Sequence, residues 1–293
     1  MATRKMSAVA ETIRWLGLLA ALCMLPGCSS MMASAANGMA KDLSAAMLNH
    51  DDPELVASAI PAYLLMMDAM IQSHPKNASV LRSGAKLYGA YASLFVKDPR
   101  RSKRLARRAF DYSLRAFCIR FSQGCGVEKM VFDDFKAVID KLGRDDVETL
   151  YALGSSWAGW IRANSDDWSA IAKLAQVKAV MQRVIELDES YDLGGAHMYL
   201  GVLGSLIPPA SGGRPEEAKA HFERAVTIAK DKNLLPKVYY AQYYARLMFD
   251  RPLHDKLLNE VIIADPKVDG FVLINTMAQS RAIKLLREAD EFF

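Results

Sequence analysis

The sequence predicts an all-α fold, arranged as a right-handed array of antiparallel helix pairs. Apolar residues recur three and four positions apart along most of the 293 residues, which is the period of an amphipathic helix. Strand-like alternation of apolar and polar residues is nearly absent. Short breaks rich in Pro, Gly, Asp and Asn separate the helical segments, and such short connections place consecutive helices side by side in opposite directions.

Residues 1–27 have the pattern of an export signal rather than of a structural element. Three basic residues precede an apolar run that is about half as long as the ~20 residues needed to span a membrane. The run ends in Leu-Pro-Gly-Cys at Cys28, which is similar to the lipobox of bacterial lipoproteins, where the cysteine is lipidated and becomes the mature N-terminus. An ordinary secretory signal with a chance cysteine is the alternative.

Lipid chains on Cys28 would hold the mature protein at a membrane. Residues 28–39 then form a short tether, and residues 40–293 form a single helical domain. Ser29, rather than Asp, follows the cysteine, which favours the periplasmic side of the outer membrane. Without the signal the net charge falls close to zero, so nucleic acid is not an expected partner.

Cys118 and Cys125 are the cysteines that remain once the signal and the lipid anchor are set aside. They lie seven positions apart across a Gly-containing turn, and an exported chain works in an oxidising compartment. We therefore expect a disulfide between them. Two buried thiols are the alternative.

The first predicted helix follows Asp52, which is placed to cap it, and has Pro53 in its first turn. Pro61 lies inside this helix and predicts a kink or a division into two short helices. The amphipathic segments that follow end at compact turns. They predict helices over residues 78–96, 99–117, 127–142, 145–163, 167–187, 191–206, 215–230, 234–249, 252–264 and 271–288.

Two of these helices carry the small–bulky–small residues that the second helix of a tetratricopeptide unit needs where it crosses its neighbour. Three further segments keep the same spacing with less typical residues, and the sequence distance from one such segment to the next varies. The array is therefore predicted to consist of degenerate tetratricopeptide-like repeats. The two clearest rows are Ala106, Phe110 and Ser113, and Ala218, Phe222 and Ala225.

Residues 191–226 hold a group of glycine and proline pairs beside one of these helices. They are Gly194-Gly195, Gly201, Pro208-Pro209, Gly212-Gly213 and the helix with Ala218, Phe222 and Ala225. This stretch resembles the signature region of the TatT family, which are tetratricopeptide-like lipoproteins associated with tripartite ATP-independent periplasmic (TRAP) transporters. The lipobox, the total length and a helix with Trp157 and Trp160 agree with this resemblance. It implies a periplasmic lipoprotein that associates with a TRAP-type solute-binding protein, and a homotrimer with a ligand-accepting pore or cavity.

The glycine pairs bracket the helix predicted over residues 191–206. Backbone freedom at both ends could set the angle at which this repeat meets its neighbour. Alanine at Gly194 and Gly195 is therefore expected to cost stability or assembly if either residue needs a positive φ.

Motifs of catalytic and metal sites, such as H-E-x-x-H and G-x-S-x-G, are absent from the sequence. The five histidines are scattered singly, and a local hydrogen bond between His221 and Glu217, one turn apart, explains one of them. Carboxylate pairs before predicted helices are explained as caps. We expect no enzyme, no metal and no cofactor.

Two sets of residues are candidates for recognising a ligand or partner. The first set falls on the first helices of predicted pairs, which line the concave side of such arrays, although large aromatics at helical spacing are usually core. The second is a basic helix that could dock an acidic partner or anionic headgroups, with a solvated face as the alternative. The sets are Trp157, Trp160, His197, Tyr199, Tyr240, Tyr243 and Tyr244, with Tyr239 beside them, and Arg100, Arg104, Arg107 and Arg108.

Two classes of function stay open from the sequence. The first is a membrane-anchored accessory that associates with a TRAP solute-binding protein and binds or hands on a small hydrophobic or carboxylate-bearing ligand. The second is a lipoprotein scaffold that helps to assemble an envelope machine and takes no small ligand. A continuous apolar cavity lined from residues 157–160 and 239–244 would favour the first class. A shallow polar groove, with the aromatics packed in the core, would favour the second.

Overall fold

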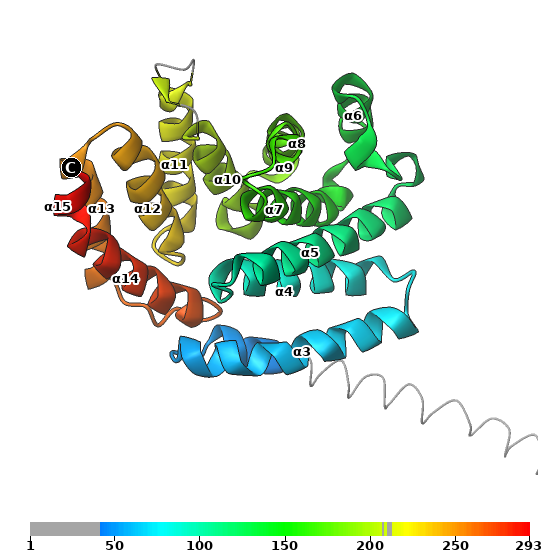
Figure 1. Ribbon diagram of the computed structural model, residues 1–293, viewed down its shortest axis with the longest axis horizontal. Helices are drawn as coiled ribbons and strands as arrows, with labels where there is room; N and C mark the ends of the chain where they lie inside the picture. The colour runs from blue at the N-terminus through cyan, green and yellow to red at the C-terminus, as the bar shows by residue number, and fades with distance from the viewer. Residues whose placement is uncertain (1–41, 207, 210–212) are drawn as a thin grey trace, which may run out of the picture. The chain divides into compact units, whose positions relative to one another are not determined.

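The computed structural model describes residues 42–206, 208–209 and 213–293, and this part of the chain is all helical, without a strand (Figure 1). Residues 42–48 form a helical segment of their own, and Asn49–Phe293 forms the large compact unit. The predictions made for the export signal, Cys28 and the tether lie outside the described residues, as does Gly212. The predicted all-α, repeat-like fold is confirmed.

The helices of the large unit follow most of the predicted segments, and their ends differ by a few residues. The single helix predicted over residues 167–187 is wrong, because a turn at residues 172–173 divides it into Trp168–Ile171 and Leu174–Asp188. Beyond 3₁₀ turns, a further departure is a π-helical turn, Tyr240–Ala245, that continues α12. The helices are α3 (Pro53–Ser73), α4 (Ala78–Leu94), α5 (Pro99–Arg120), α6 (Phe132–Ile139), α7 (Val147–Ala163), α8 (Trp168–Ile171), α9 (Leu174–Asp188), α10 (Gly195–Gly204), α11 (Pro215–Ala229), α12 (Leu235–Tyr239), α13 (Arg251–Ile263), α14 (Val272–Arg287) and α15 (Ala289–Phe292).

Helix α3 does not divide at Pro61, so that part of the sequence prediction is wrong. The Asp52 side chain caps the helix as expected, because it accepts hydrogen bonds from the backbone N–H groups of Glu54 and Leu55. Pro61 removes one backbone donor, but the buried stripe continues on both sides of it, from Val56 to Ile71. Tertiary packing of this stripe therefore keeps the helix continuous.

The small–bulky–small rows lie where helices approach closely. Ala218, Phe222 and Ala225 of α11 are fully buried, and Phe222 faces α10 at Gly201. A Cβ at Gly201 would lie 2.8 Å from the Phe222 ring, and one at Gly204 would lie 2.9 Å from the Cβ of Ala218. The glycines of α10 therefore allow α11 to pack at a distance that other residues would prevent.

Among the first helices of the pairs, α4 contacts α7, α10 contacts α12, and α12 contacts α14. Their partners α5, α9, α11 and α13 each pack against two successive first helices, and α9 in this way joins α7 to α10. We call the surface formed by α4, α7, α10, α12 and α14 the inner face. It is the side on which the aromatic candidates were expected.

The last part of the unit returns to the first. Helix α14 contacts α3, and Figure 1 shows its N-terminal end beside the start of that helix. The Asn49 side chain donates a hydrogen bond of 2.7 Å to Asp269 and accepts one from the backbone N–H of Gly270. The row of repeats in residues 49–293 is thus closed by contacts between its ends.

Cys118, in the last turn of α5, is joined to Cys125 by a disulfide in the structure, with the two Cα atoms 4.4 Å apart. The bond spans the 3₁₀ turn Ser122–Gly124 that follows α5. Gly124 rests on the ring of Phe117, where a Cβ would lie 2.2 Å from the ring. The turn therefore combines a covalent link with a close contact that suits glycine.

Candidate functional site

Three of the aromatic candidates lie in the core. The Trp157 side chain has no exposed surface and stacks on Phe110, with ring centroids 5.1 Å apart. Tyr240 is 4% exposed and stacks on Phe222 of α11, and Tyr244 is 5% exposed. These side chains fill the space between helices, so they serve packing rather than a surface.

The other aromatic candidates are half-buried on inner-face helices. Trp160 of α7 stacks on Phe110 of α5, with ring centroids 5.6 Å apart. Tyr199 of α10 meets Tyr151 of α7 edge-on at 6.1 Å, and Tyr243 meets Tyr239 edge-on at 5.6 Å. Tyr151 was not among the residues predicted from the sequence, although it lies on the same predicted helix as Trp157.

Polar groups contact two of these half-buried rings, Tyr151 and Tyr239. The Tyr151 hydroxyl donates a hydrogen bond of 2.6 Å to Asp192. The Arg281 guanidinium lies over the Tyr239 ring, 5.2 Å from its centroid. The Nε of Arg281 donates a hydrogen bond of 2.8 Å to Gln242 Oε1. Burial raises the pKa of Tyr239, and the positive charges of Arg281 and Arg162 act in the opposite direction.

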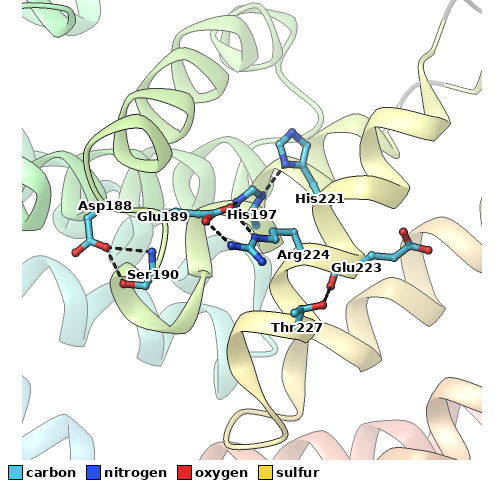
Figure 2. A network of polar contacts seen from close by, with 8 residues as sticks. All are labelled: Asp188, Glu189, Ser190, His197, His221, Glu223, Arg224 and Thr227. Carbon is cyan, nitrogen blue, oxygen red and sulfur yellow. Dashed lines mark hydrogen bonds and ion pairs between the residues drawn. The ribbon is translucent and has the colours of Figure 1, made fainter.

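A second polar group joins α9, α10 and α11, and its members point toward one another in Figure 2. The His197 and His221 Nδ1 atoms are 2.8 Å apart, and His197 Nε2 lies 3.0 Å from Glu189 Oε1. Arg224 donates two hydrogen bonds, of 2.6 and 2.7 Å, to the Glu189 carboxylate. The predicted local bond between His221 and Glu217 does not form, because His221 turns to His197 and Glu217 pairs with Arg214 instead.

The contacts of this histidine pair are satisfied when both rings are neutral. In that arrangement His197 Nε2–H donates to the Glu189 carboxylate, and His197 Nδ1 accepts from the Nδ1–H of His221. Burial lowers the pKa of His197 and lowers the pKa of His221 to about 4. The hydrogen bonds from Arg224 lower the pKa of Glu189 to about 2. A buried neutral pair is thus held beside a permanent ion pair.

Acidification is expected to destabilise the protein through His221. Its folded pKa, about 4, lies below the ordinary value of 6.5, so the unfolded chain binds the proton more readily between these values. The free energy of unfolding should fall by about 2–3 kcal/mol between pH 7 and pH 4 from this group. Chemical denaturation across that range measures the fall, which should be smaller in His221→Asn. An equal reduction in His74→Asn, an exposed histidine in the turn after α3, would contradict the assignment.

The turn into α10 requires glycine at one position. Asp192, Leu193 and Gly194 all have positive φ, and Gly194 has φ 76°. Gly194→Ala should lower the free energy of unfolding by about 1–2 kcal/mol, because an L side chain in this region is strained and its Cβ would lie 3.1 Å from Ile228. Gly159→Ala, on α7 with open space around it, is the matched control and should be neutral or stabilising. Thermal melting of the two variants tests the difference.

The basic helix α5 is partly used inside the fold. Arg107 pairs with Asp111 at 2.7 Å, and Arg108 pairs with Asp68 of α3 at 2.7 Å. Arg100 and Arg104 are exposed and make no ion pair with a described residue. Of the four arginines predicted to form a docking surface on this helix, Arg100 and Arg104 therefore remain without an ion pair to a described residue. Among the described residues, no cluster of three or more His, Cys, Asp or Glu side chains could hold a metal ion.

Comparison with known proteins identifies the family. The model of the family described as TRAP transporter T-component (TAtT) matches residues 49–293, which is the whole large unit. The chain is also similar to an uncharacterised protein of Treponema pallidum (strain Nichols), with 24% identity over 274 residues that cover 86% of this chain and 84% of the relative. With the repeat-like all-α fold already described, the chain belongs to the TatT family of TRAP transporter T-components.

Proposed function

We propose that this protein is a lipid-anchored accessory that associates with a TRAP solute-binding protein and receives a small ligand on its inner face. Lipidation at Cys28 would hold it in the periplasm, on the outer membrane, and assembly as a homotrimer is part of the proposal. Membership of a transporter-component family supports a role in TRAP transport rather than in catalysis.

The observation that favours ligand binding over a pure scaffold is the chemistry of the inner face. Tyr199, Tyr239 and Tyr243 are half-buried there, and their hydroxyls make no hydrogen bond with a described residue. Each of these hydroxyl oxygens keeps some solvent-exposed surface, so water can contact it. Partly enclosed rings with free polar ends are typical of surfaces that bind small molecules.

In-cell crosslinking of the lipoprotein in its own host, followed by affinity capture and mass spectrometry, tests the association. We expect a TRAP solute-binding protein among the leading partners, and a loss of that partner when Cys28→Ala prevents anchoring. Recovery of envelope-assembly proteins instead, with no solute-binding protein, would favour the scaffold and contradict this function. Lys256→Gln, an exposed change on α13, controls for general effects of substitution.

A further inference from the structure

The outer side of α3 is a long apolar surface that no other described helix covers. The helix packs on α4 through its buried stripe, from Val56 to Ile71, and it lies at the edge of the unit in Figure 1. Among the described residues α3 is the one helix long and apolar enough to cross a membrane, but its packed stripe keeps it at the surface of the fold. We call the opposite side the α3 outer face, and its exposed residues are Leu55, Ser58, Ala59, Ala62, Leu65, Met66 and Ala69.

The large apolar side chains of the α3 outer face are open to water. Leu65 is 70% exposed, Leu55 is 55% exposed and Met66 is 39% exposed. Together with the alanines between them they recur three and four positions apart, so they form one stripe along the helix. Single apolar residues scattered on a surface are ordinary, whereas a continuous stripe indicates a contact surface.

The polar side chains of this stretch are satisfied without water. Asp68, the charged residue within the span of the face, turns inward, where its carboxylate pairs with Arg108 at 2.7 Å and accepts from the Tyr112 hydroxyl at 2.6 Å. Ser58, the polar residue of the face itself, donates its hydroxyl to the Glu54 carbonyl at 2.9 Å. The α3 outer face can therefore leave water without leaving a polar side chain unpaired.

The size of the face favours a lipid surface over a protein as its cover. A helix of 21 residues is about 32 Å long and one side of it about 10 Å wide, so the face offers roughly 300 Å². A stable protein–protein interface buries about 800 Å² on each partner. A narrow, uncharged stripe suits the acyl-chain boundary of a bilayer, because lipids adapt to the shape that they cover.

The position of α3 in the chain places this face near the proposed anchor. Residues 29–52 separate Cys28, the proposed site of lipidation, from the start of α3 at Pro53. Helix α3 is also the first helix of the large unit. A lipid on Cys28 would keep the membrane at a high local concentration around α3, so that a modest apolar stripe can stay bound.

We propose that the α3 outer face lies against the lipid bilayer, with Leu55, Leu65 and Met66 at the boundary between headgroups and acyl chains. The helix then lies parallel to the membrane. The proposal rests on the lipid anchoring proposed above. It adds that a second surface of the chain holds the large unit at the membrane, and it names that surface.

A fluorophore at residue 65 of the full-length lipoprotein in phosphatidylcholine vesicles tests the contact. Leu65→Cys supplies the one reactive thiol of the mature, lipidated protein, because Cys28 would carry lipid and Cys118 is bonded to Cys125. An NBD label there should emit at shorter wavelength than in water. It should lose about half of its fluorescence to phosphatidylcholine that carries a nitroxide high on its acyl chain. No loss of fluorescence would overturn the proposal.

Two controls exclude a general approach of the protein to the vesicle. Ile263 is an apolar residue at the end of α13 and is 84% exposed, so Ile263→Cys provides a matched position that should keep its fluorescence. Equal losses at residues 65 and 263 would contradict a specific contact. Because the α3 outer face carries no charge, high salt should leave the loss at residue 65 unchanged. A loss that salt removes would indicate docking through charge and would also overturn the proposal.

Charges placed on the face should release it from the bilayer. Leu55→Glu combined with Ala62→Glu should reduce the quenching at residue 65 by about half or more, because carboxylates resist transfer to an apolar environment. Both positions are exposed, so the fold should be kept, and thermal melting checks this. Ile283→Glu, at an exposed apolar position on α14, is the matched control and should leave the quenching unchanged. Unchanged quenching in the double variant, with wild-type melting, would contradict the contact.

Other covers of the face give different results. A label that emits at shorter wavelength but is not quenched by lipid nitroxides would indicate a cover of protein. Dilution of the protein in lipid then distinguishes a second copy from residues 29–41 of the same chain, and either cover overturns the proposal.

The mass of the N-terminal peptide separates this inference from the proposed function. Lipid on Cys28 without quenching at residue 65 would contradict the membrane contact alone. A peptide without lipid would contradict the anchoring and, with it, this inference. The association with a TRAP solute-binding protein is tested separately by the crosslinking described above.

Discussion

Replacing Trp157 by Ala is expected to lower the free energy of unfolding by about 3–5 kcal/mol, the largest loss of stability that we predict for a single substitution in this protein. The side chain has no exposed surface, and it contacts Phe110 face to face and Phe135 edge to face at 5.9 Å. Truncation would leave a cavity between α5, α6 and α7 that these rigid elements cannot close. Denaturant unfolding measures the loss.

Trp168 provides a matched control for this prediction. It is the same residue type, but its side chain is 86% exposed in the short helix α8. Trp168→Ala should change the free energy of unfolding by no more than about 0.5 kcal/mol. If Trp157→Ala were as mild as Trp168→Ala and instead abolished ligand binding, the assignment of Trp157 to the core would be wrong.

Asn275 is expected to give the second largest loss. The side chain is fully buried and forms hydrogen bonds to two loops. Its Oδ1 accepts from the Leu234 N–H at 2.9 Å, and its Nδ2 donates to the carbonyls of Lys232 and Pro266. Asn275→Ala leaves the buried N–H of Leu234 and the two partly buried carbonyls without these partners, which should cost about 2–4 kcal/mol.

Asn275→Asp tests whether stability depends on the Asn275 amide group as a hydrogen-bond donor. The carboxylate keeps an acceptor for Leu234 but has no donor for the two carbonyls, so its pKa must rise on folding. The stability that it retains is present at low pH and is lost as the pH rises past the ordinary aspartate value of about 3.9. Asn259→Asp on exposed α13 is the control. A pH dependence that is the same in both variants would contradict the role of Asn275 as a donor.

The features of the fold that the sequence predicts are those that depend on residues close to one another in the chain. Caps such as Asp52, proline in first turns and the Ala218–Phe222–Ala225 spacing follow from interactions within one or two turns, so the sequence contains them directly. Pro61 failed as a predictor because its cost is local, whereas the packing that keeps α3 whole comes from other helices.

The candidate site was predicted less well, for a related reason. Helical spacing tells which residues share a face, but not whether that face meets another helix or the inner surface. Tyr240 and Tyr244 turn to the core and Tyr239 and Tyr243 to the inner face, within the same short segment. The His197–His221 contact joins two helices and has no signature in either helix alone.

The contacts of Asn49 with Asp269 and Gly270 bear on how the chain unfolds. In an open row of repeats the end repeats have one neighbour fewer, so they fray first and unfolding is gradual. Here α14, the last long helix, contacts α3 across most of the sequence, so both ends of the row have a neighbour within residues 49–293. Such long-range contacts slow folding, because two distant parts of the chain must meet before they can form. They also join the repeats into one cooperative unit.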